Sequence, residues 1–350
     1  MNELLCYTSD FDAAEQEINQ LGGLVRLRLT SKAFVAALPL AELSTLVHCK
    51  IAPNGNIDDE TERLVGIWKA SNVPRAPTPS EGVVWNSPDY STPGAQVLDL
   101  AEGEAAIEYE QSTGTPTSRY MTGRISAGII IVDSNTPGEL QFSDDEHATL
   151  RDEVLRSLHF LSHEEPRANI GFYPDFKEVA VSLPSESSSV SDPYENLERR
   201  WRDTALAELG FPAGRAGYQA YLQQLMSELG TEWGFVAFFT KFPVHWFAYA
   251  IWEKVVMHFN NDAWGPSAIH RVFAHEICHV FGAADEYGNC QCGSLHGHLQ
   301  SPNNNCVSCF GSVSEQAPCL MDRNVLTICE HTRKQIGWCP PLIETETTTL

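Results

Sequence analysis

A short run of residues between positions 275 and 285 limits what this chain can fold into more than any other feature. His275 and His279 stand four residues apart and enclose Glu276, in the order His-Glu-Ile-Cys-His. Residues four apart lie on one face of an α-helix, so both imidazoles can bind a single zinc ion. Glu276 can face the same ion and accept a proton from metal-bound water. This spacing predicts a mostly buried helix that carries a metal site.

Gly282 and Asp285 extend this pattern beyond the helix. Glycine readily adopts the left-handed conformation that ends helices, so the chain can turn at Gly282 and return Asp285 to the ion as a third ligand. The longer pattern is far more specific than the two histidines alone. The alternative is a surface helix with two polar histidines and an ordinary glycine cap. Cys278 points away from the metal face and is interpreted as a small buried apolar residue.

The extended pattern resembles the metzincin clan of zinc metallopeptidases, whose motif ends in histidine or aspartate and is followed by a methionine turn below the metal. Asp285 is similar to the aspartate of snapalysin-type enzymes, and Met321 is the candidate for the methionine turn because of its position after the motif. The resemblance implies that His275, His279 and Asp285 bind zinc. It also implies that Glu276 is the catalytic base and that Met321 forms a hydrophobic floor, although a methionine in a core is usually only packing.

Other architectures with two such histidines fit less well. In thermolysin-like enzymes the third ligand is a glutamate on a later helix. Glu315 lies in a polar stretch that is interpreted as a loop, and Glu330 follows the candidate methionine turn. Gly282 would have no role in that arrangement.

Length and composition agree with an enzyme of about two domains. The chain has 350 residues, 43% of them hydrophobic, and a formal net charge of −23. Nucleic acid and anionic membranes are not expected as partners because this charge would repel both. A protein or peptide substrate is the expected partner, and the oligomeric state is left open.

No targeting segment is visible in the sequence. The start of the chain lacks a basic region followed by a long apolar run, and no stretch has the roughly 18 consecutive apolar residues of a membrane span. A cytoplasmic location is therefore expected, with secretion by a non-classical route as the alternative.

Residues 1–70 are predicted to form a small α+β domain in ferredoxin-like order. The predicted elements are strands at 4–8, 25–29 and 33–38, a helix opened by Ser9, and a short helix at 40–46. This domain weakly resembles the propeptide or inhibitor domains attached to some proteases. We therefore hypothesise that it folds against the active site or assists folding, with an unrelated small domain as the alternative.

Residues 71–122 contain six prolines and are predicted to be a linker. The catalytic domain is expected at 123–343, followed by a tail at 344–350. A capping box at Ser143 and an Asp-Pro pair at 192–193 predict two helices. The strands are predicted at 127–132, 179–183, 235–240, 246–251 and 254–259.

In metzincins the strand nearest the cleft is an exposed edge, which binds substrate as an added strand. Residues 255–259 are the candidate for this edge, with an interior strand as the alternative. His258 within them is interpreted as structural. Residues 260–262 are predicted to form a turn, with calcium binding as a further alternative.

Cysteines gather after the motif, within residues 290–339. Two closely spaced pairs have the look of a structural zinc knuckle; these are Cys290, Cys292, Cys306 and Cys309. His296 or His298 could replace one thiolate. Disulfides are the rival interpretation and would imply an oxidising compartment. Zinc is preferred here because no targeting segment is visible.

Together these features predict an α+β chain in which a small ferredoxin-like domain precedes a metzincin-like catalytic domain. That domain would contain a mixed twisted sheet, the zinc-binding helix, the methionine turn and a C-terminal helix. The expected activity is hydrolysis of peptide bonds with one catalytic zinc and Glu276 as the base, and a second structural zinc is left open. The alternatives are a non-catalytic zinc-stabilised binding module and a metal-dependent hydrolase of a non-peptide substrate such as RNA.

Overall fold

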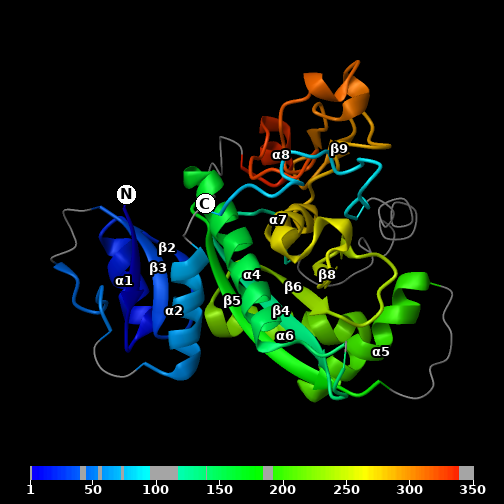
Figure 1. The fold of residues 1–350 in the computed structure, drawn as a ribbon. Helices are drawn as coiled ribbons and strands as arrows, with labels where there is room; N and C mark the ends of the chain where they lie inside the picture. The colour runs from blue at the N-terminus through cyan, green and yellow to red at the C-terminus, as the bar shows by residue number, and fades with distance from the viewer. Residues whose placement is uncertain are drawn as a thin grey trace, which may run out of the picture.

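The computed structural model describes residues 2–39, 45–53, 57–71, 75–94, 117–138, 140–183 and 192–338. Its centre is a mixed eight-stranded sheet in the order β1-β3-β2-β5-β4-β6-β8-β7 (Figure 1). The strands are β1 (Asn2–Tyr7), β2 (Leu24–Arg28), β3 (Ala33–Leu38), β4 (Arg124–Ser134), β5 (Gly171–Val181), β6 (Trp233–Thr240), β7 (Ala248–Ile251) and β8 (Lys254–His258). The helices are α1 (Phe11–Gln20), α2 (Asp59–Ser71), α4 (Asp144–Glu164), α5 (Pro193–Glu208), α6 (Gly214–Leu229), α7 (Ile269–Val280) and α8 (Glu330–Gln335). This is a mixed arrangement of helices and strands, as the sequence predicted.

Strand β4 shows why the sheet is covered on both faces. It pairs in parallel with β5 on one side and β6 on the other. Ile129 and Ile131 pack in a hydrophobic core shared with α4 and α7, whereas Ile130 and Val132 pack in a second core with α5 and α6. Successive side chains of a strand point to opposite faces. The continuous apolar run at 127–132 predicted such a doubly covered strand, and that prediction is confirmed.

The N-terminal strands extend the same sheet. Strand β3 lies between β1 and β2, and β2 joins β5 through the parallel pair Leu27 and Phe172. Figure 1 shows this unit at one end of the sheet, whereas α7 lies towards the other end. The predicted domain boundary at residue 70 therefore stays a prediction, but the sheet itself is continuous across the two predicted domains.

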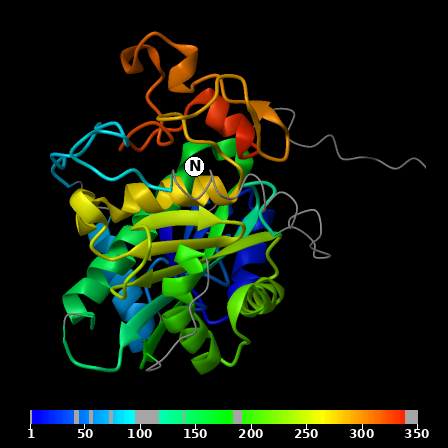
Figure 2. The ribbon, with the colours of Figure 1, turned by 90° about the vertical axis from the view of Figure 1, so that its right-hand side faces the viewer.

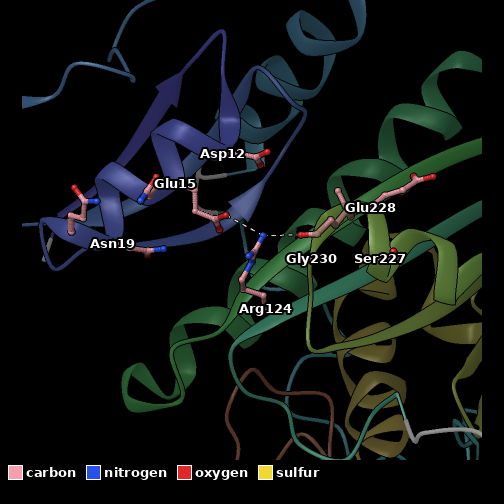
Figure 3. Close-up of a pocket in the computed structure, with 10 residues that line it drawn as sticks. Asp12, Glu15, Asn19, Arg124, Ser227, Glu228 and Gly230 are labelled. Carbon is pink, nitrogen blue, oxygen red and sulfur yellow. Dashed lines mark hydrogen bonds and ion pairs between the residues drawn. The ribbon is translucent and has the colours of Figure 1, made fainter.

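Arg124 joins the N-terminal unit to the rest of the molecule at the start of β4. Its guanidinium lies 3.1 Å from a carboxylate oxygen of Glu15 on α1 and donates a hydrogen bond of 2.7 Å to the carbonyl oxygen of Leu229 on α6 (Figure 3). These residues line a depression of about 670 Å³. Its lining also includes Asp12 and Glu228 but none of the predicted metal ligands.

The helix α2 was not anticipated from the sequence. It follows the expected short helix at 40–46, of which residues 40–44 lie outside the described residues. Leu64, Val65 and Trp68 of α2 pack in the same core as α4. The first part of the predicted linker is likewise packed, since Trp85 is fully buried. Residues 71–122 are therefore not a simple spacer where the structure describes them.

The prediction that residues 255–259 form the exposed edge strand is wrong. Strand β8 pairs with β6 on one side and with β7 on the other, so residues 255–258 are interior and β7 is the edge among the described strands. The chain passes β7 first, then turns at Trp252 and returns as β8 beside β6. Both strands are apolar, so the pattern of side chains does not show which of the two is outermost.

Helix starts agree with the sequence in most places. The capping box of Ser143 and Glu146 is present at α4, and Asp192 caps α5 before Pro193. The prediction that Ser9 opens helix α1 is wrong. Asp10 is the capping residue, and its side chain accepts a hydrogen bond from the N–H of Ala13. The predicted tail at 344–350 lies outside the described residues. No helix in the described ranges has the length and apolar character to cross a membrane.

Candidate metal centre

Helix α7 carries the motif and is held at its first turn by α4. The N–H of His270 donates to a carboxylate oxygen of Glu153 at 2.8 Å, and the hydroxyl of Ser157 donates to the carbonyl oxygen of His270 at 2.8 Å. The first of these bonds satisfies a backbone N–H that a helix start leaves without a partner, and the second adds a further link between the two helices. The apolar positions of α7 pack in the main core, so the helix is almost entirely buried.

His275, His279 and Asp285 converge on one point. The two Nε2 atoms lie 3.0 Å apart, and each lies 3.2 Å from Oδ1 of Asp285. Ligand atoms about 2.0–2.2 Å from a tetrahedral zinc ion are separated by a little more than 3 Å. The three residues that the sequence predicted as ligands therefore form a triangle that fits a zinc ion.

Gly282 makes the turn that brings Asp285 back. It has φ of +91°, in the left-handed region, and its N–H donates to the carbonyl oxygen of His279 at 2.9 Å. An added Cβ would lie 2.7 Å from the Cα atom of Gly297. Both the conformation and the close approach therefore require glycine at this position.

Hydrogen bonds fix the orientation of both imidazoles. Nδ1 of His275 lies 3.0 Å from the carbonyl oxygen of Leu320, and Nδ1 of His279 lies 2.9 Å from that of Ala283. A carbonyl oxygen only accepts hydrogen bonds, so the proton of each neutral ring lies on Nδ1. This leaves the Nε2 lone pairs directed at the triangle, as zinc binding requires.

Glu276 is a buried carboxylate beside this triangle. Its side chain has no exposed surface, and neither of its oxygens accepts a hydrogen bond of normal geometry from the described residues. Burial raises the pKa of Glu276 to about 8, and the negative charge of Asp285 adds to the shift. A cation in the triangle would oppose this shift. The donor set and the unsatisfied carboxylate therefore both fit a divalent metal.

The loop around Met321 lies against α7. Met321 is fully buried, and its carbonyl oxygen accepts a hydrogen bond of 2.9 Å from the N–H of Glu286. Trp85 also reaches this loop, because its Nε1 donates to the carbonyl oxygen of Leu320 at 2.6 Å. The Trp85 ring lies edge-on to His275 with centroids 5.4 Å apart. Trp85 could not be predicted from the sequence, since nothing in a proline-rich segment marks one tryptophan as a neighbour of the candidate metal site.

The prediction of a structural zinc knuckle in the cysteine-rich segment is wrong. The structure contains two disulfides, Cys290–Cys306 and Cys292–Cys309, with S–S distances of 2.05 and 2.03 Å. A sulfur in a disulfide is not a thiolate and does not bind zinc in this way. Disulfides persist in oxidising compartments, so this pairing does not favour the cytoplasmic location expected from the sequence.

A second buried cluster lies next to the metal centre. Glu286 accepts hydrogen bonds from the Sγ of Cys329 and the hydroxyl of Thr332, both at 2.9 Å, and from the side-chain amide of Asn305 at 2.7 Å. The Sγ of Cys319 accepts one from the N–H of Cys329 at 3.3 Å. Burial raises the pKa of Glu286 to about 8. The cluster joins the disulfide-bonded loop, the Met321 loop and α8, and the sequence did not single it out as a unit.

The remaining candidates lie away from the triangle. Nε2 of His258 lies 3.3 Å from the carbonyl oxygen of Lys241, and burial lowers the pKa of His258. In the turn after β8, the carboxylate of Asp262 accepts a hydrogen bond of 3.3 Å from the N–H of Ser91. Calcium binding at this turn stays a prediction.

Comparison with known proteins gives little. No protein-family model matches the chain, and no curated protein sequence matches it. Among solved structures, a zinc-dependent peptidase from Methanocorpusculum labreanum (strain Z) is similar at 16% identity, over 60% of this chain and 99% of that chain, with a TM-score of 0.27. A similarity of this size carries no argument about the function of this chain.

Proposed function

We propose that this chain is a zinc-dependent metalloendopeptidase. The observation that carries the proposal is the triangle of His275, His279 and Asp285 with Glu276 buried beside it. Structural zinc sites are closed by four protein ligands, whereas catalytic sites have three and keep a position open. Within the described part of the chain, no fourth histidine, cysteine or carboxylate joins the three.

The residues present can divide the work of peptide hydrolysis. Zinc held by the three ligands would polarise a peptide carbonyl and lower the pKa of a water molecule towards about 7. Glu276 would accept the proton of the attacking water and return it to the leaving amine. The outer edge of β7, which lies beside α7, carries backbone groups that can hold an extended peptide.

Metal content and peptide cleavage test this proposal together. We expect the purified chain to contain one zinc ion that is lost in a variant with both His275→Ala and His279→Ala. We also expect the zinc-loaded chain to cleave members of a peptide library or casein. A zinc-loaded chain that leaves every peptide intact would favour a binding module. Cleavage of RNA without cleavage of peptides would favour a metal-dependent hydrolase of a non-peptide substrate.

A further inference from the structure

Residues 90–94, here called the strap, run from a buried tryptophan to the metal centre. Tyr90 stacks on the ring of Trp264, with centroids 4.1 Å apart and an angle of 26° between the ring planes. Pro93 and Gly94 at the other end are buried. In Figures 1 and 2 the segment that contains the strap passes above α7, beside the C-terminal loops. A part of the predicted linker therefore reaches the candidate active site.

Three consecutive carbonyl groups of the strap each accept a hydrogen bond from a side chain of the surrounding protein. The pairs are Trp264 Nε1 with Ser91 at 2.8 Å, Trp246 Nε1 with Thr92 at 2.6 Å, and Tyr287 OH with Pro93 at 2.6 Å. These donors bind the backbone and do not depend on the side chains of the strap. Binding through main-chain groups is how proteins hold extended peptides of varied sequence.

Gly94 lies directly in front of Glu276. Its N–H donates to the carbonyl oxygen of Ala248 on the edge strand β7 at 2.9 Å. An added Cβ at Gly94 would lie 3.4 Å from both carboxylate oxygens of Glu276 and 3.7 Å from Cδ2 of His279. The backbone of Gly94 therefore fills the space that a peptide would have to enter to reach Glu276.

The two ends of this segment are held differently. Upstream, Trp85 is fully buried, and its N–H donates to the carbonyl oxygen of Asp322 at 3.1 Å. Downstream, residues 91–94 are held mainly by hydrogen bonds to their backbone. Gly94 has φ of +62°, so the chain leaves the extended conformation at this residue. Residues 91–94 are therefore held by hydrogen bonds that the main chain of an incoming peptide could also make, whereas Trp85 is anchored in the core.

We propose that the strap is an internal occupant of the position that a substrate peptide takes beside Glu276. It covers the metal centre in the resting chain, and a peptide reaches Glu276 only after residues 91–94 have left. The released donors, Trp246, Trp264 and Tyr287, and the edge of β7 would then bind the main chain of the incoming peptide. This inference rests on the proposed function, because it takes the substrate at this site to be a peptide.

A substitution at Gly94 tests the strap, and Gly82 supplies a matched control. Valine at position 94 would be strained at φ of +62° and would be pushed against Glu276. Gly82 lies in the same segment with φ of +79°, but an added Cβ there has nothing within 4 Å. Gly94→Val should displace the strap, whereas Gly82→Val carries similar backbone strain without the contact. Tyr90→Ala, which removes the ring stack, is a second displacing variant.

Three measurements follow the strap and the centre separately. Hydrogen–deuterium exchange of residues 85–94 reports whether the strap is seated, and the rate of zinc extraction by 1,10-phenanthroline reports access to the metal. For Gly94→Val and Tyr90→Ala we expect faster exchange, zinc loss at least about tenfold faster, and a higher kcat/KM for peptides, because the closed fraction no longer opposes binding. Gly82→Val should match the unsubstituted chain. The peptide acetyl-Ser-Pro-Asp-Tyr-Ser-Thr-Pro-Gly-amide, added to Gly94→Val, should slow zinc loss again.

The outcomes separate this inference from the proposed function. Unchanged hydrogen exchange in both displacing variants would overturn the proposal that the strap covers the metal centre. Faster hydrogen exchange with an unchanged rate of zinc loss would overturn it as well. Faster zinc loss without cleavage of any peptide by any variant would support the strap as a cover of the metal and would reject the peptidase proposal. Peptide cleavage at the same rate in all variants would support the peptidase and reject the strap as an inhibitor.

Discussion

Nδ1 of His275 lies 3.0 Å from the carbonyl oxygen of Leu320, which joins α7 to the loop that contains Met321. The same oxygen accepts a hydrogen bond from Nε1 of Trp85 at 2.6 Å. Residues from three distant parts of the sequence therefore meet at one carbonyl group beside the candidate zinc site. The position of His275 depends on all three, because an outer hydrogen bond sets the orientation of a metal-binding imidazole.

Replacing Glu276 by glutamine should separate metal binding from turnover. The variant keeps the size of the side chain and all three predicted ligands but removes the group that accepts a proton. We expect zinc content to be unchanged and kcat to fall by about 10²–10⁴-fold, which is the usual contribution of a general base. Zinc analysis and hydrolysis of a quenched fluorescent peptide would measure this. A variant that retains full activity would contradict the role of Glu276.

Replacing Asp285 by asparagine should weaken the metal site. The amide lacks the negative charge that a hard oxygen ligand supplies to zinc. We expect the zinc affinity to fall by more than about tenfold, with a lower melting temperature at limiting zinc because the bound metal stabilises the folded state. A zinc titration followed by competition with a chromophoric chelator gives the affinity. Asp12→Asn, at an exposed position of α1, is the control and should leave the affinity unchanged.

Glu153, which binds the start of α7, should make the free energy of unfolding depend on pH. Burial raises the pKa of this carboxyl group, but the hydrogen bonds from His270 and the charge of Arg75 outweigh burial, so the net pKa lies below its usual 4.5. A depressed folded-state pKa contributes stability above the unfolded-state pKa and loses it as the pH falls through the folded value. We expect the free energy of unfolding of Glu153→Gln to be about 1–3 kcal/mol lower than that of the unsubstituted chain at pH 7.

The difference between Glu153→Gln and the unsubstituted chain should narrow as the pH falls below about 4.5. Urea unfolding of both proteins at several pH values would measure it. Glu62→Gln, at an exposed position of α2, serves as the control. A difference that stays constant down to pH 3 would contradict the depressed pKa.

Glu198 should be important for stability far from the metal. It is fully buried on α5, and one carboxylate oxygen lies 2.6 Å from Nζ of Lys254 on β8. Removing one partner leaves an unpaired buried charge, so Glu198→Ala should cost about 3–5 kcal/mol. The exposed pair of Glu330 and Lys334 on α8 is the contrast, and Glu330→Ala should have little effect because solvent screens it. Thermal unfolding with calorimetry would separate the two cases.

Local patterns in the sequence predicted the centre of this molecule well. Because of the four-residue spacing of the histidines and the turn at Gly282, three side chains form a compact triangle in the structure. These are His275, His279 and Asp285. Each of these steps is set by helix geometry or by the conformation of one residue, within about ten positions of the chain. The doubly covered strand β4 was predictable for the same reason.

Features that depend on distant pairing could not be predicted in this way. The order of β7 and β8 is set by which strand pairs with β6, and both strands are apolar. The disulfides are a choice between two chemistries that the same cysteine spacing allows. The strap is held beside Glu276 by hydrogen bonds to its carbonyl groups, which every residue possesses, so no side-chain pattern marks it.

The hydrogen bond between Glu286 and Met321 has a consequence for how such chains can vary. It brings together the two ends of residues 286–321, so the whole disulfide-bonded excursion leaves and returns at one place. Both disulfides close within the excursion and none ties it to the sheet. Lengthening a loop whose ends are already joined costs little free energy. Insertions or a grafted reporter module at exposed positions of this region, away from Gly297 and Asn305, should therefore be tolerated while the geometry of the neighbouring candidate ligands is preserved.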